Sequence, residues 1–176
     1  MSVSYLTPKA RRAAGGGGGR GSVAIERIAA GEVVAAYGGR CVGRDEFDRL
    51  PADQKARGIQ IEERLFLVGA PEAEPADFIL HSCEPKCGVS GSTVIVALRH
   101  IDAGEAITYD YATSDGSDHL EFECMCGSAL CRGRVTGYDW LLPELQIRYR
   151  GNFSPYLAAR ISALADIGAE RRAFSY

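Results

Sequence analysis

The spacing of three cysteines constrains this chain most. Cys124, Cys126 and Cys131 form a C-x-C-x4-C cluster within eight residues. Neighbouring side chains on a helix or a strand point in different directions, so these are not three independent core residues. One centre must gather them, and tetrahedral zinc with thiolate ligands is the usual one. Such a zinc ion needs a fourth donor, so the sequence predicts a metal site closed by a residue from elsewhere in the chain.

A disulfide is the alternative use of these cysteines. Cys126 and Cys131 could close a small loop, but Cys124 would then have no purpose. The chain has six cysteines, and in a reducing compartment clustered cysteines are metal ligands more often than disulfides. We therefore predict a metal site and a cytoplasmic location.

Length and composition exclude several classes of protein. With 176 residues and 46% hydrophobic residues, the chain forms one domain with an ordinary core. The net charge of −3, without a basic run among aromatics, argues against nucleic-acid binding as the main task. No apolar stretch reaches the roughly 18–20 residues of a transmembrane helix, and the N-terminus has no signal-peptide apolar region. The sequence therefore predicts no membrane partner and leaves the oligomeric state open.

Most of the chain has the pattern of short strands. Residues 22–42 are β-like with turn signals at glycines, and residues 59–68 alternate as a strand pair. A loop is expected at residues 71–76. Thr93–Leu98 is apolar and β-branched, which predicts a buried strand, and Ala106–Tyr111 predicts the next one.

Helices are expected in two places. Residues 45–57 predict a short polar helix with Asp45 as N-cap. Pro143–Arg150 predicts another, followed by a helix with Ser154 as N-cap and Pro155 in the first turn. That last helix has an apolar face, for which packing on the core is the preferred interpretation over contact with a second subunit. The apolar face of this last helix consists of Leu157, Ile161, Leu164, Ala165 and Gly168.

The predicted fold class is α+β, mostly β.

Four motifs follow one another along the chain: Gly-Arg-Gly-Ser-Val-Ala at 19–24, Phe-Ile-Leu-His-Ser-Cys-Glu-Pro-Lys at 78–86, Gly-Glu-Ala-Ile-Thr-Tyr-Asp-Tyr at 104–111, and the cysteine segment with Cys131-Arg132-Gly133. In this order they resemble the SET-domain protein-lysine methyltransferases with their zinc-binding post-SET tail. The resemblance covers about residues 19–140. Residues 140–160 also resemble the tail of small bacterial SET proteins.

The resemblance implies a fold and a division of the chain. The fold would be short curled β-sheets with a pseudoknot, in which a C-terminal segment threads the loop of the second motif. We expect a flexible N-terminal segment at 1–18, a SET domain at 19–115, a post-SET zinc segment at 116–140 and a C-terminal helical tail at 141–176. The threading would bring His81 and Tyr111 together.

The resemblance also implies a cofactor, S-adenosylmethionine. Arg20 and Gly21 would meet it through backbone groups, since a missing side chain allows close approach. Leu80 and His81 lie where the family holds the adenine, and Phe122 is expected to stack on it. Trp140 is an equal candidate for stacking or for the core.

The acceptor would be a lysine ε-amine of a protein, and three tyrosines match the family's catalytic positions. Tyr111 matches the catalytic tyrosine, which lies beside the cofactor. Tyr109 falls where the family alternates Phe and Tyr, and a hydroxyl there predicts mono- or dimethylation. Tyr37 resembles a tyrosine that lines the lysine channel, although packing alone is an equal interpretation.

The motif match favours Cys83 over Cys87 as the fourth zinc ligand, whereas Cys41 is predicted to be a buried apolar residue. The implied zinc ligands are Cys83, Cys124, Cys126 and Cys131.

Two residues depart from the family pattern. Leu80 and Lys86 each replace an asparagine, and leucine makes none of the amide's hydrogen bonds. Three hypotheses therefore stay open: a protein-lysine methyltransferase, an enzyme on the same scaffold that uses a small-molecule acceptor, and a non-catalytic, zinc-stabilised interaction module.

Overall fold

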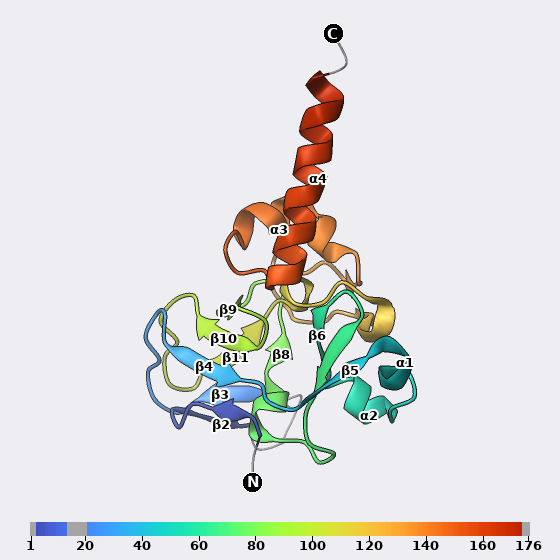
Figure 1. Cartoon of the computed structure of the whole chain (residues 1–176). Helices are drawn as coiled ribbons and strands as arrows, with labels where there is room; N and C mark the ends of the chain where they lie inside the picture. The colour runs from blue at the N-terminus through green and yellow to red at the C-terminus, as the bar shows by residue number, and fades with distance from the viewer. Residues whose placement is uncertain (1–2, 14–20, 174–176) are drawn as a thin grey trace.

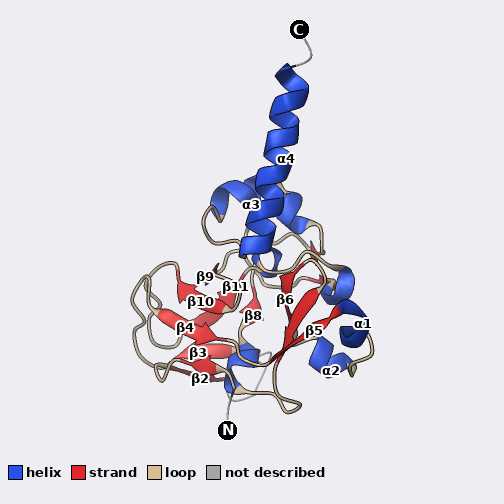
Figure 2. Ribbon diagram, in the orientation of Figure 1, coloured by secondary structure: helices blue, strands red, loops and turns tan. Residues whose placement is uncertain are grey.

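The chain folds into a β-rich body with helices at one end (Figure 1). The computed structural model describes residues 3–13 and 21–173. Figure 2 shows the strands gathered in the body and the long helix α4 (Pro155–Ala173) projecting away from it. Among the described residues, no helix combines the length and apolar character needed to cross a membrane.

The largest sheet has the strand order β1-β4-β10-β9-β11-β3-β2, and β8 pairs with β11 beside this path. Its buried side chains form the main hydrophobic core together with residues of the loops, and Ile28, Val34 and Ile107 in this core are fully buried. The strands are β1 (Tyr5–Leu6), β2 (Ala10–Arg12), β3 (Ser22–Ala24), β4 (Val33–Ala36), β8 (Leu80–His81), β9 (Cys87–Ser90), β10 (Val94–Ala97) and β11 (Ala106–Tyr109).

A second sheet, of order β5-β7-β6, carries one wall of the site described below. It consists of β5 (Arg40–Gly43), β6 (Ile59–Glu62) and β7 (Leu65–Val68), with helices α1 (Arg44–Phe47) and α2 (Ala52–Lys55) between its first two strands. Phe47 and Phe66 stack with ring centroids 4.0 Å apart in its core. The strand pair predicted at 59–68 is therefore confirmed.

The C-terminal third contains the cysteine segment and the two helices α3 and α4. Strands β12 (Phe122–Glu123) and β13 (Arg134–Val135) pair antiparallel on either side of the cysteines. Along the whole described part of the chain, four 3₁₀ turns connect the elements, and α3 precedes α4. Their bounds are η1 (Pro75–Phe78), η2 (Tyr111–Thr113), η3 (Asp118–Leu120), η4 (Asp139–Leu141) and α3 (Pro143–Arg148).

The pairing of β11 is the topological feature that builds the site. Its residue Thr108 lies opposite Leu80 of β8, and Tyr109 lies opposite both His81 and Cys87 of β9, with all three strands parallel. The Ser82 N–H also donates to the Tyr109 carbonyl at 3.2 Å. As predicted, the segment that contains His81 and the segment that contains Tyr111 lie together.

Of the two predicted N-caps, Asp45 was wrong, whereas Ser154 has the predicted position. The residue that precedes α1 is Gly43, and Asp45 lies inside the first turn. Ser154 does precede α4, but its Oγ is buried without a hydrogen-bond partner among the described residues. The Ser154 carbonyl accepts from the Ala158 N–H at 2.9 Å, so Ser154 is the N-cap residue of α4 through its backbone alone.

The expected core packing of α4 holds only for its first turns. Leu157 is fully buried and Ile161 packs against the cluster around Trp140, whereas Leu164 is 48% exposed. The helix leaves the body after about two turns, as Figure 1 shows. Trp140 itself is 3% exposed within this cluster, so its place is in the core.

Candidate active site

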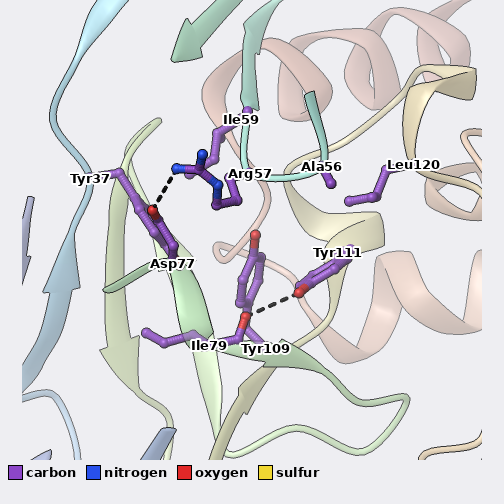
Figure 3. A pocket seen from close by; sticks show the side chains of 10 residues that line it. Tyr37, Ala56, Arg57, Ile59, Asp77, Ile79, Tyr109, Tyr111 and Leu120 are labelled. Atoms are coloured by element: carbon purple, nitrogen blue, oxygen red, sulfur yellow. Dashed lines mark hydrogen bonds and ion pairs between the residues drawn. The ribbon is translucent and has the colours of Figure 1, made fainter. Parts of the chain in front are cut away.

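The three tyrosines of the sequence analysis meet in one small cavity. Tyr37 from the end of β4, Tyr109 from β11 and Tyr111 from η2 line it together with Ile79 (Figure 3). The space inside is about 30 Å³. Tyr109 and Tyr111 are neighbours, with ring centroids 4.8 Å apart. The cavity is therefore a narrow site with three aromatic rings in its lining.

The Tyr111 hydroxyl has a defined orientation. It donates to the Ile79 carbonyl oxygen at 3.0 Å (Figure 3). Burial raises the pKa of Tyr111 far above its ordinary value, and the neighbouring Tyr109 adds to the effect. Since the proton is committed to Ile79 and the group stays neutral, the oxygen lone pairs remain free to accept from a ligand.

The other two hydroxyls also stay protonated. Burial raises the pKa of Tyr109 and that of Tyr37 well above the usual value for tyrosine. The site thus presents neutral hydroxyls, which orient an amine without taking a proton from it.

A buried ion pair forms the opposite wall. The Arg57 Nη1 lies 3.1 Å from Asp77 Oδ2, with side-chain exposures of 15% and 5% (Figure 3). Arg57 also donates to the carbonyls of Asp53, Ala70 and Pro71, which ties the end of α2 to the loop before η1. Neither member of this pair was predicted from the sequence, because nothing in their local pattern separates them from surface charges.

His81 joins the tyrosine site to the cysteine segment. Its Nδ1 accepts from the Tyr111 N–H at 3.3 Å, and its Nε2 lies 3.3 Å from Cys83 Sγ. Burial lowers the pKa of His81 to about 4, although the carboxylate of Asp110 opposes this. The neutral ring therefore carries its proton on Nε2 and directs it at the Cys83 sulfur.

Phe122 completes an aromatic surface on the same side. Its ring centroid lies 5.5 Å from that of His81 and 6.0 Å from that of Tyr111, both in edge contacts. Phe122 is half-buried, so one part of the ring remains available to a ligand. The structure thus brings together two residues predicted to hold adenine, from positions 41 residues apart in the sequence.

Gly21 and Leu80 lie against each other at the edge of this surface. A Cβ placed on Gly21 would come within 3.1 Å of Leu80 Cδ1. Leu80 is 40% exposed, so the apolar residue in place of asparagine faces solvent and does not bury an unpaired group. The predicted contact residue Arg20 lies outside the described residues.

Lys86, the second departure, has a structural role. Its Nζ donates to the Ala106 carbonyl at 3.2 Å and lies 3.3 Å from Glu105 Oε1. Both partners stand at the start of β11, so the lysine fastens the loop before β9 to the strand that leads to Tyr109.

The four predicted cysteines converge beside His81. The Sγ atoms of Cys83, Cys124, Cys126 and Cys131 all lie within 4.8 Å of one another. The Cys83 and Cys124 sulfurs are 3.8 Å apart, which matches the edge of about 3.8 Å that a ZnS₄ tetrahedron with Zn–S of about 2.3 Å would have. The donor set and its spacing therefore fit zinc. None of the six cysteines is in a disulfide.

The ionisation of these thiols supports the same chemistry. Burial raises the pKa of the Cys124 thiol to about 12. For Cys126, burial acts in the same direction, but hydrogen bonds from the backbone of Cys83 and Ser128 lower its pKa to about 6. One thiolate is thus available near neutral pH, and a divalent cation would favour the others in that form.

The two remaining cysteines lie outside the cluster. Cys87, the rival fourth ligand, is fully buried in β9, and burial raises its pKa to about 12. Cys41 is exposed, so the prediction of a buried residue was wrong. It lies on the edge strand β5, where Val42 takes the position that faces the core.

A family model decides the relationship. The model of the SET domain matches residues 19–112, more than half of the chain. The chain belongs to the SET domain family. Solved structures agree: the SET protein KRYPTONITE, in complex with mCHH DNA, H3(1-15) peptide and SAH, superposes with a TM-score of 0.52 at 25% identity. That match covers 70% of this chain and 28% of KRYPTONITE.

A second SET structure supports the fold alone. Arabidopsis thaliana SUVH6 in complex with SAM superposes with a TM-score of 0.53 at 21% identity, over 66% of this chain and 30% of SUVH6. The predicted SET fold is therefore confirmed.

Curated relatives carry names that indicate an activity. "Histone-lysine N-methyltransferase trithorax" of Drosophila virilis is 34% identical over 126 residues. "Probable histone-lysine N-methyltransferase set-23" of Caenorhabditis elegans is 32% identical over 132 residues. Each match covers 65% of this chain, but only 3% of trithorax and 54% of set-23. The chain therefore spans only part of the length of these relatives.

Proposed function

We propose that this SET domain is an S-adenosylmethionine-dependent methyltransferase that acts on the ε-amine of a protein lysine. The observation that carries the proposal is the Tyr111 hydroxyl, which donates to the Ile79 carbonyl at 3.0 Å and so turns its lone pairs to the cavity. The names of the relatives, and the SAH and SAM in the titles of the structural neighbours, support the same activity.

The chain would perform this reaction by alignment. S-adenosylmethionine supplies a methyl group on a sulfonium, and its transfer to an amine is an in-line displacement that needs no protein nucleophile. Loss of water in the narrow cavity disfavours a charged ammonium, which would lower the pKa of an entering lysine. Tyr111 then accepts from the amine or from the polarised methyl C–H groups and holds the lone pair on line.

The cofactor would lie on the surface formed by Gly21, Leu80, His81 and Phe122. Gly21 offers backbone without a side chain, and the Phe122 ring offers a face for adenine. Arg20 is proposed to contact the cofactor through its backbone as well. Zinc, held by the four cysteines, would fix the segment that carries Phe122 against His81.

Replacing Tyr109 by phenylalanine tests the proposed limit on methylation. Wild type is expected to stop at mono- or dimethyl-lysine, because the hydroxyl occupies part of a cavity of about 30 Å³. Tyr109→Phe is expected to yield trimethyl-lysine as a main product, as mass spectrometry of a methylated peptide would detect. A wild-type protein that ran readily to trimethyl-lysine would contradict this role.

Restoring the asparagine at position 80 tests the cofactor surface. Leu80→Asn is expected to tighten S-adenosylmethionine binding by about 5- to 10-fold, because one net hydrogen bond contributes about 1 kcal/mol. Stability should change little, since Leu80 is 40% exposed. Calorimetry measures the affinity, with Leu65→Asn at a similarly exposed strand position as the matched control. Equal affinities in all three proteins would remove residue 80 from the cofactor site.

The first experiment should incubate the protein with methyl-labelled S-adenosylmethionine and whole-cell lysate, and read the label in protein and small molecules separately. Label on protein lysines that disappears in Tyr111→Phe would support the proposal and reveal the substrate. Cofactor consumption without protein label would support the small-molecule acceptor. No consumption, with no cofactor binding by calorimetry, would support the non-catalytic module.

The compartment and the class of substrate are part of the same proposal. A reducing compartment such as the cytoplasm suits a cluster of four free thiols. A protein substrate is preferred to nucleic acid because the chain has no aromatic-interleaved basic run. A bacterial source remains a prediction from the tail.

A further inference from the structure

Arg132 lies between the cysteine cluster and the segment that carries Tyr111. Its Nη1 and Nη2 contact the two carboxylate oxygens of Asp110 at 2.7 and 2.8 Å. Its Nε donates to Asp139 Oδ2 at 2.8 Å. The Asp110 side chain is completely buried and that of Arg132 is 14% exposed. The two acids therefore hold the guanidinium in one orientation.

Asp110 transmits this contact to Tyr111. It precedes Tyr111 in the chain and is the N-cap of η2, where its Oδ1 accepts from the Ala112 N–H at 3.1 Å. The same oxygen lies 3.6 Å from His81 Nδ1. The Asp110 carboxylate thus fixes the turn on which the Tyr111 ring is mounted.

The main chain of Arg132 contacts the cysteine cluster. Its N–H donates to the Cys83 sulfur at 3.4 Å, and it directly follows Cys131. One residue therefore contacts the cluster with its backbone and the tyrosine turn with its side chain. The Cys83 carbonyl also accepts from Arg148 at 3.2 Å, so the C-terminal helices are tied to the same point.

We propose that Arg132 is a positioning residue that aligns Tyr111 for methyl transfer only when the cysteine segment is in place. The inference rests on the proposed function. A buried carboxylate without a partner is strongly unfavourable, so the Asp110 turn keeps its geometry only while the arginine is present. A displacement of about 1 Å at a reacting group is enough to reduce the rate about 100-fold.

Lysine is the informative replacement. It keeps the positive charge but has no planar fork that contacts both oxygens of a carboxylate at once. Arg132→Lys is expected to lower kcat about 10- to 100-fold. This is the usual size of the effect when a residue that orients a functional group through a hydrogen bond is replaced. The peptide KM should stay within about threefold and the zinc content should be unchanged, because no cysteine is altered.

Arg134→Lys is the matched control. Arg134 lies two residues along the same segment and pairs with Glu121 at 3.3 Å, but its side chain is 62% exposed. Its replacement should leave kcat unchanged. An unchanged kcat in Arg132→Lys, or a loss of activity only in proportion to a loss of zinc, would overturn the proposal.

A second readout does not depend on catalysis. In protein labelled with 3-fluorotyrosine, the ¹⁹F signal that disappears in Tyr111→Phe belongs to Tyr111. This signal should shift in Arg132→Lys and stay in place in Arg134→Lys. If wild type transfers no methyl group, the proposed function fails, and the ¹⁹F result alone decides the role of Arg132: an unmoved signal would refute it.

Discussion

Replacing Tyr111 by phenylalanine is expected to reduce kcat at least about 100-fold while the affinity for S-adenosylmethionine changes less than about threefold. The reason is the direction of one hydrogen bond. Because the hydroxyl donates to the Ile79 carbonyl, its oxygen is a preorganised acceptor, and removing one such polar group costs about 100- to 1,000-fold in rate. Such an interaction acts mainly in the transition state, so kcat and kcat/KM should fall together.

Steady-state kinetics and calorimetry together check this expectation. Tyr5→Phe serves as the control, because Tyr5 lies on β1 and is 45% exposed. A parallel loss of turnover and cofactor affinity in Tyr111→Phe would mean that the ring supports the pocket. Full activity would leave the observation that carries our proposed function without a chemical role.

The second large effect concerns the cysteine cluster. Cys131→Ser is expected to weaken zinc binding strongly and to lower the stability by about 3 kcal/mol, because one of the four ligands is lost from a site that contributes roughly 10–16 kcal/mol. For a chain of this length, the melting temperature should fall by about 6–12 °C. Cofactor binding should weaken as well, because the segment that carries Phe122 loses its anchor beside His81.

Metal analysis, thermal unfolding and calorimetry test this, and Cys41→Ser is the natural control. Cys41 is exposed and outside the cluster, so its replacement should leave zinc content and melting temperature as they are. If Cys131→Ser kept its zinc, the donor set would be wrong. If it lost zinc but bound the cofactor normally, the metal would have no part in the pocket.

Local patterns were sufficient for the residues that form motifs. The tyrosines, His81 and the cysteines keep a fixed order and spacing in the sequence, and the choice of Cys83 over Cys87 followed from its motif. The strands at 59–68 and 106–111 followed from apolar alternation and β-branched residues. These signals are short-range, so they can be recognised in the sequence without knowledge of the tertiary structure.

Other features depend on neighbours that are distant in sequence. The sequence places Arg132 in the cysteine motif but does not predict its partner, Asp110, which precedes it by 22 residues. Arg57 and Asp77 became part of the cavity through pairing across the end of α2 and η1. Cys41 was misplaced because an edge strand exposes one of its faces, and strand order is not visible in a local pattern.

The parallel contacts of β11 also affect how this domain folds. Tyr109 pairs with residues of β8 and β9 that precede it by more than 20 positions, while the Tyr149 hydroxyl contacts the Cys83 carbonyl across 66 positions. Contacts between residues so far apart in the sequence form slowly, because the intervening loops must close first. During synthesis the contact between Tyr149 and Cys83 forms only after residue 149 has left the ribosome. Under the proposed function, methyl transfer would therefore be a reporter of completed folding.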